Sequence, residues 1–173
     1  MGKTTEKSKP EYIEGSLCLY TDGSAITHLV NVKRYGGWSL YITDHKDEHI
    51  GFHGGAENTT ISRMEQEAMN RALEFLIKRV NSGENRPIHI YSDSQFVVNS
   101  INKGWLSNWN REKFIARANA DIWKRVWGNL EKLRLMKSVY TIHHIRGHQK
   151  DLTKPHVFGN NVADVLADYK QFL

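Results

Sequence analysis

Four carboxylates in this chain occupy positions from which they could act together. Asp22 and Asp93 each end a short apolar run that predicts a buried strand. In α/β sheets, ligands gather beyond the carboxyl ends of strands where the strand order reverses. Glu65 and Asp164 belong to helical patterns and could point to the same place. Acids brought this close repel one another unless a cation lies between them, so the pattern indicates a cation site.

The type of ligand indicates which cation and which reaction such a site would serve. Carboxylate oxygens favour hard cations such as Mg²⁺ and Mn²⁺ over zinc or copper. Four carboxylates carry a charge of about −4, which two divalent ions balance. Two such ions suit in-line phosphoryl transfer, because one activates the attacking water and the other stabilises the leaving oxygen. We therefore expect two Mg²⁺ ions per site, with Mn²⁺ as a substitute.

Each carboxylate also has a structural interpretation when it is taken alone. Asp22 begins an Asp-Gly-Ser sequence that is typical of turns, and Asp93 precedes a serine suited to a helix N-cap. Ser62 stands three residues before Glu65, which predicts a capping box. Asp164 fits an exposed position on a helix. The metal site is favoured by the set of four in its order, and not by any single member.

The elements that must position these acids alternate between strand and helix. Apolar and β-branched runs predict strands at residues 16–22, 36–43, 49–56, 87–92 and 139–145. Helical spacing predicts helices at residues 62–81, 94–101, 110–135 and 159–172, with a break near residue 119. The first three strands predict an antiparallel meander. The later strands are separated by helices, which predicts parallel pairing within an α/β fold.

Length and composition bound the class of protein. The chain has 173 residues, of which 39% are hydrophobic and 25% charged, as in a single soluble domain. No apolar run approaches membrane-spanning length. Cys18 is the only cysteine, which excludes an intrachain disulfide and fits a reducing compartment, so we expect a cytoplasmic protein. Residues 1–15 lack the apolar core of a secretory signal and are expected to form a disordered tail.

The positive charge is concentrated in one stretch. The net charge is +5 and the sequence pI is about 9.3. Residues 103–137 contain nine Lys or Arg and three Asp or Glu, which leaves the rest of the chain close to neutral. Part of this stretch fits a solvated helical face. The excess of cations over acids nevertheless favours contact with a phosphate backbone.

Five segments, taken in order, resemble the motifs of the type 1 ribonuclease H family. They are Tyr20–Ser24, Arg63–Glu65 followed by Ala68, Tyr91–Val97, Ile145–His148 and Asn160–Ala167. The resemblance covers residues 16–172 and implies a five-stranded mixed sheet flanked by helices. It implies that residues 16–173 form a catalytic domain that hydrolyses the RNA strand of RNA–DNA hybrids. The products would carry 5′-phosphate and 3′-hydroxyl ends, and Asp22, Glu65, Asp93 and Asp164 would hold the metal.

The resemblance also implies roles for residues around the carboxylates. His148 would assist proton transfer or product release, as a loop histidine with a pKa near neutrality can. A solvated loop histidine is the alternative. Gln95 and Asn160 would contact the RNA strand or the scissile region. Thr60 and Asn108 match family positions that grip a phosphate of the DNA strand.

Further contacts would come from the basic stretch and from the start of the glutamate helix. Trp105 could pack on a deoxyribose, whereas Trp109 fits a core position better. The family often has asparagines where Ile61 and Ser62 stand here, so Ser62 would offer a hydroxyl to the hybrid. Asn58 replaces an arginine of some members. The protrusion at residues 110–120 is shorter than in well-known bacterial members.

Two other functions fit part of this pattern. A non-catalytic binder of hybrid or duplex RNA would use the basic stretch, but acids beside phosphates count against it. A resolvase or integrase relative would share the acidic set on the same sheet. The Gly147-His148 loop and the Arg63–Glu65 helix start favour the type 1 family instead. We expect a monomer whose partner is an RNA–DNA hybrid and which has no membrane partner.

Overall fold

The computed structural model describes residues 10–26 and 34–172. No helix in these ranges is long and apolar enough to cross a membrane. In chain order the elements are β1 (Leu17–Ala25), β2 (Tyr35–Thr43), β3 (His49–Glu57), α1 (Ile61–Asn81), β4 (Ile88–Ser92), α2 (Gln95–Asn102), α3 (Trp105–Arg111), α4 (Ala120–Leu135), β5 (Tyr140–His144), α5 (Pro155–Ala167) and the 3₁₀ turn η1 (Tyr169–Phe172).

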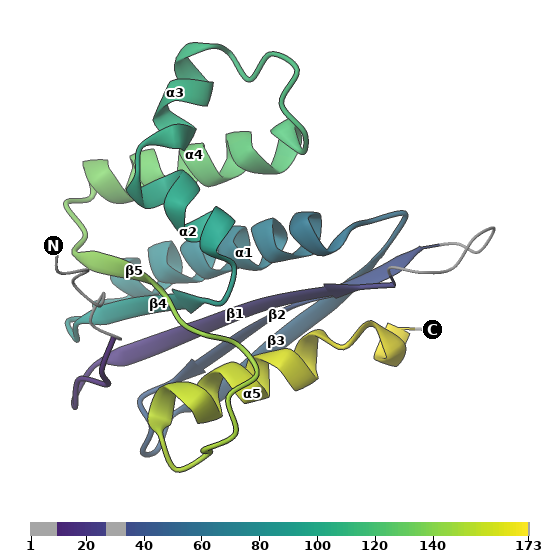
Figure 1. Cartoon of the computed structure of the whole chain (residues 1–173). Helices are drawn as coiled ribbons and strands as arrows, with labels where there is room; N and C mark the ends of the chain where they lie inside the picture. Colours follow the sequence, from purple (N-terminus) through teal and green to yellow (C-terminus); the bar gives the residue numbers. More distant parts are fainter. Residues whose placement is uncertain (1–9, 27–33, 173) are drawn as a thin grey trace, which may run out of the picture.

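The five strands form one mixed sheet in the order β3-β2-β1-β4-β5. The first three strands are antiparallel to one another, and β4 and β5 run parallel to β1. This arrangement confirms the predicted fold class. Helices α1 to α4 gather on one side of the sheet and α5 covers the other side (Figure 1). Strand order therefore reverses between β1 and β4, which is the position where a ligand site is expected.

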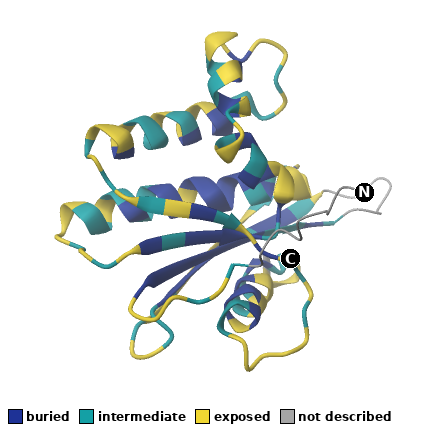
Figure 2. Cartoon of the chain, turned by 60° about the vertical axis from the view of Figure 1, so that its left-hand side comes forward, coloured by how far each residue is buried: buried dark blue, intermediate teal, exposed yellow. Residues whose placement is uncertain are grey.

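The sheet has an apolar core on each face. Leu17 and Leu19 of β1 point into the larger core beneath α1, together with residues from α2, α3 and α4. Cys18 and Tyr20 point into the smaller core beneath α5. Side chains alternate between the two faces of a strand, and β1 therefore serves both cores at once. Figure 2 shows the buried residues concentrated in the central strands and on the inner faces of the helices.

Strand β1 continues beyond Asp22, so the interpretation of Asp22-Gly23-Ser24 as a turn is wrong. Asp22 pairs with Ser39 of β2, and the antiparallel pairing runs on to Ala25. The parallel pairing between β1 and β4 does end here, at Thr21 opposite Ser92. Asp22 and Asp93 are thus the first residues past that pairing on adjacent strands. The reversal of strand order, and not a turn, determines their position.

Two glycines allow helices on both faces to approach the backbone closely. A Cβ built on Gly23 would lie 2.4 Å from the backbone nitrogen of Glu65 in α1. A Cβ on Gly159 of α5 would lie 2.3 Å from ring carbons of Tyr20 in β1. Neither separation is sterically possible for a side chain. These contacts bring the helix of Glu65 and the helix of Asp164 as near to β1 as backbone allows.

The predicted capping box at the start of α1 is wrong. Thr60 is the N-cap, and its hydroxyl accepts a hydrogen bond from the backbone nitrogen of Arg63. Ser62 lies inside the first turn, where its hydroxyl accepts from the side-chain amide of Gln66. Glu65 therefore takes no part in capping and remains available for the site. The N-cap predicted before α2 is confirmed, because the Ser94 hydroxyl accepts from the backbone nitrogen of Val97.

Two helix boundaries also differ from the sequence prediction. The basic stretch holds two helices, α3 and α4, separated by irregular backbone at residues 112–119. Four non-glycine residues there have positive φ: Lys113, Phe114, Ala116 and Asn119. The predicted break near residue 119 is confirmed. Helix α5 begins at Pro155 instead of residue 159, because proline at the first helical position needs no backbone N–H and has the required φ.

Part of the predicted N-terminal tail, residues 1–9, lies outside the described residues, as does most of the loop between β1 and β2. Within the described part, Tyr12 contacts the rest of the protein. Its hydroxyl donates to the backbone oxygen of Asp44. Its ring packs edge-on against His45 and His156. The chain before β1 therefore covers one end of the smaller core.

A histidine–tyrosine cluster holds the first turn of α5 against the sheet. The Tyr20 hydroxyl of β1 lies 2.7 Å from Nε2 of His45 and 2.8 Å from Nδ1 of His156. His45 belongs to the β2–β3 hairpin and His156 to α5. Burial, and then the neighbouring His156, lowers the pKa of His45 to about 4. Burial also lowers the pKa of His156. Both imidazoles are therefore neutral at pH 7.

This cluster predicts a loss of stability in acid. A histidine whose pKa is lower in the folded than in the unfolded protein stabilises the fold above pH 6.5 and loses that contribution as pH falls towards 4. We expect the Tm of His45→Gln to fall less than that of the wild type across this range, because glutamine keeps a hydrogen bond without titrating. Thermal denaturation followed by circular dichroism tests this. Parallel Tm curves for the two proteins would contradict it.

The close approach of α5 to β1 predicts that two glycine-to-alanine substitutions have opposite effects on stability. Gly159→Ala would force α5 away from the Tyr20 ring, and we expect a loss of about 1–3 kcal/mol in unfolding free energy. Gly128 lies in mid-helix α4 with nothing within 4 Å of its Cβ position. Gly128→Ala is therefore expected to stabilise by about 0.5–1 kcal/mol. Urea denaturation measures both. Equal effects of the two substitutions would refute the close-packing argument.

Candidate active site

The four predicted acids come from four different elements and influence one another's ionisation. Asp22 lies in β1, Glu65 one turn into α1, Asp93 between β4 and α2, and Asp164 in α5. Asp22 interacts with both Asp93 and Asp164, and Glu65 interacts with Asp93. The tertiary structure thus brings together residues that are up to 142 positions apart in the sequence.

Burial and neighbouring charges raise the pKa values of Asp22, Glu65 and Asp93. The pKa of Asp22 is raised first by burial and then by the charge of Asp93. Burial and the charge of Asp164 raise the pKa of Asp93. Burial raises the pKa of Glu65 to about 7, although a hydrogen bond with the Ser94 side chain opposes the shift. Ionising all of them without a cation is unfavourable, which is the electrostatic state that a divalent ion relieves.

Local backbone contacts orient two of the acids. The backbone nitrogen of Gly23 donates to Oδ1 of Asp22 over 2.8 Å, which fixes that carboxylate beside its own strand. A Cβ on Gly147 would lie 2.8 Å from Oδ2 of Asp93. Glycine at this position therefore lets the loop that carries His148 lie directly against Asp93. Close packing against Asp93 thus explains the glycine that precedes His148 in this loop.

The donor set fits hard divalent cations. All four predicted ligands are carboxylates, and carboxylate oxygens suit Mg²⁺ or Mn²⁺ better than a softer metal. Within residues 10–26 and 34–172, no group of three or more His, Cys, Asp or Glu side chains is arranged closely enough to hold a metal. Asp22, Asp93 and Asp164 interact electrostatically with one another, and Glu65 interacts with Asp93.

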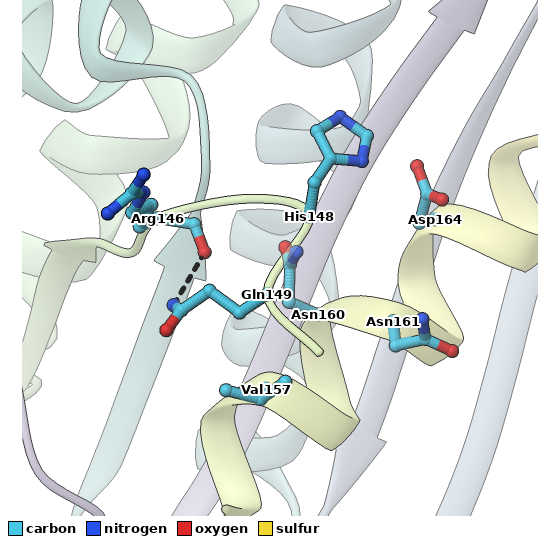
Figure 3. A pocket seen from close by; sticks show the side chains of 7 residues that line it. All are labelled: Arg146, His148, Gln149, Val157, Asn160, Asn161 and Asp164. Carbon is cyan, nitrogen blue, oxygen red and sulfur yellow. Dashed lines mark hydrogen bonds between the residues drawn. The ribbon is translucent and has the colours of Figure 1, made fainter. Parts of the chain in front are cut away.

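His148 and Asn160 lie beside the acids. They line a small pocket with Arg146, Gln149, Val157, Asn161 and Asp164. In Figure 3 the side chains of His148 and Asp164 extend to the same side of this pocket, and Arg146 lies at its other end. His148 is exposed, has a φ of 56°, and its charge lowers the pKa of Asp93. Asn160 is 6% exposed, and its Oδ1 is buried without a hydrogen-bond partner among the described residues.

The other predicted contact residues lie around the acids on the side of α1, α2 and α3. Gln95 is exposed as the first residue of α2, and Ser62 is exposed in the first turn of α1. Thr60 uses its hydroxyl to cap α1. Asn108 of α3 is exposed and accepts a hydrogen bond from Arg111. Thr60 and Ser62 thus lie at the start of the helix that carries Glu65, and Gln95 begins the helix that follows Asp93.

The two tryptophans of α3 differ as the sequence predicts. Trp109 is 8% exposed and packs edge-on against Trp123 in the larger core. Trp105 is 37% exposed, and its ring packs near that of Phe96, which is 44% exposed. Sequence reasoning did not single out Phe96 as a surface aromatic. Phe96 precedes Val97 and Val98 in the predicted helix, and the helical period places it on the face opposite that apolar pair, which is the signal that could have found it.

Sequence reasoning also missed two residues that support the acids. Ser94 was assigned to capping alone, yet its side chain also interacts with Glu65. Arg63 was noted only as part of a motif. Its guanidinium donates two hydrogen bonds to the carboxylate of Asp121 at the start of α4. This ion pair ties the beginning of α1, beside Glu65, to the basic helices, and no local pattern predicts it.

Comparison with known proteins assigns the family. A family model for RNase H matches residues 14–171. The chain belongs to the ribonuclease H family. Ribonuclease HI of Helicobacter pylori strain ATCC 700392 / 26695 is 38% identical over 108 residues, which cover 61% of this chain and 66% of that protein. Ribonuclease H of Chlorobium phaeobacteroides strain BS1 is 34% identical over 162 residues, which cover 90% of this chain and 94% of that protein.

A solved structure agrees with this ribonuclease H assignment. The native crystal structure of the Prototype Foamy Virus protease–reverse transcriptase matches with a TM-score of 0.75 and 26% identity. The match covers 96% of this chain and 22% of the viral chain, so this chain spans about a fifth of that protein's length. Ribonucleases H are hydrolases that act on RNA–DNA hybrids and generally use a divalent metal. The recognition made from five sequence motifs is confirmed.

The repulsion at the site predicts that removing one charge stabilises the metal-free protein. An acid with a raised folded pKa costs stability as pH rises from its unfolded value of 3.8. We expect Asp22→Asn in chelator at pH 8 to unfold several degrees above the wild type, since about 1 kcal/mol shifts Tm by about 2–4 °C at this size. Asparagine keeps the oxygen that Gly23 contacts.

Exposed Asp47 of the β2–β3 hairpin provides the matched control. Asp47→Asn is expected to leave the Tm unchanged, and added Mg²⁺ is expected to raise the Tm of the wild type more than that of Asp22→Asn. Differential scanning calorimetry with and without Mg²⁺ measures both effects. A Tm for Asp22→Asn at or below the wild-type value in chelator would rule out this electrostatic account.

Proposed function

We propose that this chain is an endoribonuclease that hydrolyses the RNA strand of RNA–DNA hybrids and leaves 5′-phosphate and 3′-hydroxyl ends. The observation that carries the proposal is the convergence of four acids, from β1, α1, the end of β4 and α5. Burial and neighbouring charges raise the pKa values of Asp22, Glu65 and Asp93. A protein that only binds nucleic acid gains nothing from acids beside phosphates. Residues 16–173 form the catalytic domain in this proposal.

Asp22, Glu65, Asp93 and Asp164 would hold two Mg²⁺ ions, for which Mn²⁺ can substitute. When bound, such a pair activates water and stabilises the charge that develops on the leaving oxygen. The chain's own contribution is to orient the carboxylates. Gly23 holds Asp22 through its backbone nitrogen, and Ser94 holds Glu65 through its side chain.

His148 would move the proton that the reaction displaces. It is exposed in a loop that lies against Asp93, and an imidazole there can both accept and donate a proton. Asn160 would position the RNA strand, because its buried Oδ1 has no hydrogen-bond partner in the described protein and can accept from a ribose hydroxyl. Both residues line the pocket that also contains Asp164.

The hybrid would be gripped on both strands by residues around this centre. Gln95 and Ser62 lie on the helix starts nearest the acids and would contact the RNA strand. Thr60 and Asn108 would hold a phosphate of the DNA strand, and Trp105 would pack on a deoxyribose. The basic stretch at residues 103–137 would supply salt-dependent affinity for the backbone. We further propose that the protein acts as a monomer in the cytoplasm.

A cleavage assay tests this function. A labelled hybrid incubated with protein and Mg²⁺ is expected to lose its RNA strand and keep its DNA strand, and chelator is expected to stop the reaction. Asp93→Asn and Glu65→Gln are expected to reduce the rate about 10³-fold or more. Exposed Asp47→Asn is expected to cut at the wild-type rate. Intact RNA with the wild-type protein, or equal rates for Asp93→Asn and wild type, would refute the proposal.

A further inference from the structure

A second hollow adjoins the small pocket beside the acids. This groove, here called the β5 groove, has a volume of about 870 Å³. It lies between residues 10–13, the start of α2, the end of β5 and the start of α5. Arg146, Gln149 and Val157 line both the groove and the pocket that contains His148 and Asp164. The β5 groove therefore adjoins the pocket that contains His148 and Asp164.

The walls of the β5 groove combine rings and apolar side chains with polar groups. Tyr12, His143, His156 and Pro155 contribute rings, and Ile13 contributes an apolar side chain that is 52% exposed. The two imidazoles have pKa values lowered by burial and are neutral at pH 7, so they present flat, uncharged faces and edges. Surfaces of this kind accept nucleobases without reading their sequence.

The polar groups of the β5 groove suit a phosphate backbone. Arg146 and Lys154 are exposed cations, opposed by one exposed acid, Glu11. The side-chain amides of Gln95, Asn99 and Gln149 also line the groove. Amides can both donate to and accept from nucleic acid. Rings and apolar walls beside cations are the combination found where single-stranded nucleic acid binds.

The size of the groove selects a single strand. Its volume falls within the range of about 300–1,000 Å³ that holds a drug-sized ligand, which admits a nucleotide or two and not a double helix.

Residues 1–9, which precede Pro10 at the groove, contain one apolar residue, Met1, and three lysines. Such a sequence offers few side chains that match the apolar walls. An apolar peptide would leave Arg146 and Lys154 without partners.

We propose that the β5 groove binds unpaired RNA that continues from the strand held in the cleavage centre. This inference rests on the proposed function and narrows its substrate class to hybrids whose RNA strand extends beyond the duplex. Gln95 stands at the junction, because it lies at the start of α2 beside Asp93 and also lines the groove. The extension would pass Arg146 and Gln149 and lie against Ile13 and the ring side chains.

Binding measurements with the non-cleaving Asp93→Asn protein test the proposal. Fluorescence anisotropy without metal would compare a blunt hybrid with hybrids whose RNA strand carries a short uridine tail at its 5′ or its 3′ end. A tail at one of the two ends is expected to tighten binding about tenfold, because stacked bases add to the affinity. Equal affinity for the blunt hybrid and both tailed hybrids would overturn the proposal.

Substitutions in the groove distinguish it from the rest of the surface. In the same Asp93→Asn background, Ile13→Glu and Lys154→Glu are expected to abolish the gain from the tail and to leave blunt-hybrid affinity unchanged. Phe52→Glu is the matched control for Ile13, since Phe52 is 45% exposed on β3 at the opposite edge of the sheet. Lys170→Glu, in exposed η1, is the control for the charge change. A gain that survives both groove substitutions would contradict the proposal.

Two further outcomes separate this inference from its alternatives. If deletion of residues 1–9 is required before any tail increases affinity, that segment occupies the groove and the proposal fails. Cleavage of the blunt hybrid by the wild-type protein tests the proposed function independently. Cleavage without a gain from the tail would refute the β5 groove alone. Tail binding without any cleavage would refute the nuclease function and keep the groove as a single-strand site.

Discussion

Repulsion among the clustered carboxylates is the interaction on which the rest of this structure depends. Beyond the effect of burial, the charges of Asp93 and Asp164 raise the pKa of Asp22, and the charge of Asp164 raises the pKa of Asp93. Glu65 adds a fourth acid beside Asp93. An arrangement of this kind is costly unless a cation neutralises it. The surrounding fold therefore has to hold the acids together against their charges. It does so with close backbone packing at Gly23 and Gly159 and with side-chain hydrogen bonds from β1 and β2 to α5.

Strand β1 makes most of the contacts that hold the acids together. Its even and odd residues face different helices, so one strand packs against both α1 and α5. Gly23 admits the backbone of α1, and the Tyr20 ring receives Gly159 of α5. The Ser24 and Ser39 hydroxyls donate to backbone oxygens of α5, those of Ala167 and Ala163. The positions of Glu65 and Asp164 relative to Asp22 are thereby determined by packing around a single strand.

The first turn of α5 connects the histidine–tyrosine cluster, the β5 groove and the cleavage centre. His156 joins it to Tyr20 and His45, and Pro155, His156 and Val157 also line the β5 groove. The same helix carries Asn160 and Asp164 one and two turns later. Conditions that displace this turn would therefore alter the groove and the cleavage centre together. A neutral, hydrogen-bonded imidazole suits this position because it packs like an aromatic ring and still satisfies the buried hydroxyl.

The sequence by itself determined the strand and helix order, the mixed sheet and the ribonuclease H family. Hydrophobic periodicity and the five ordered motifs are local signals, and they can be identified from the order of the amino acids alone. The sequence mispredicted the Asp22 turn, because long-range strand pairing overrides the local turn propensity there. It also mispredicted the Ser62 capping box and the start of α5, where Thr60 and Pro155 are the stronger local signals. Only the tertiary structure decided that Ser94 supports Glu65, that Arg63 pairs with Asp121, and that the β5 groove adjoins the acids. These contacts join residues far apart in the chain, and no local pattern encodes the geometry in which distant segments meet.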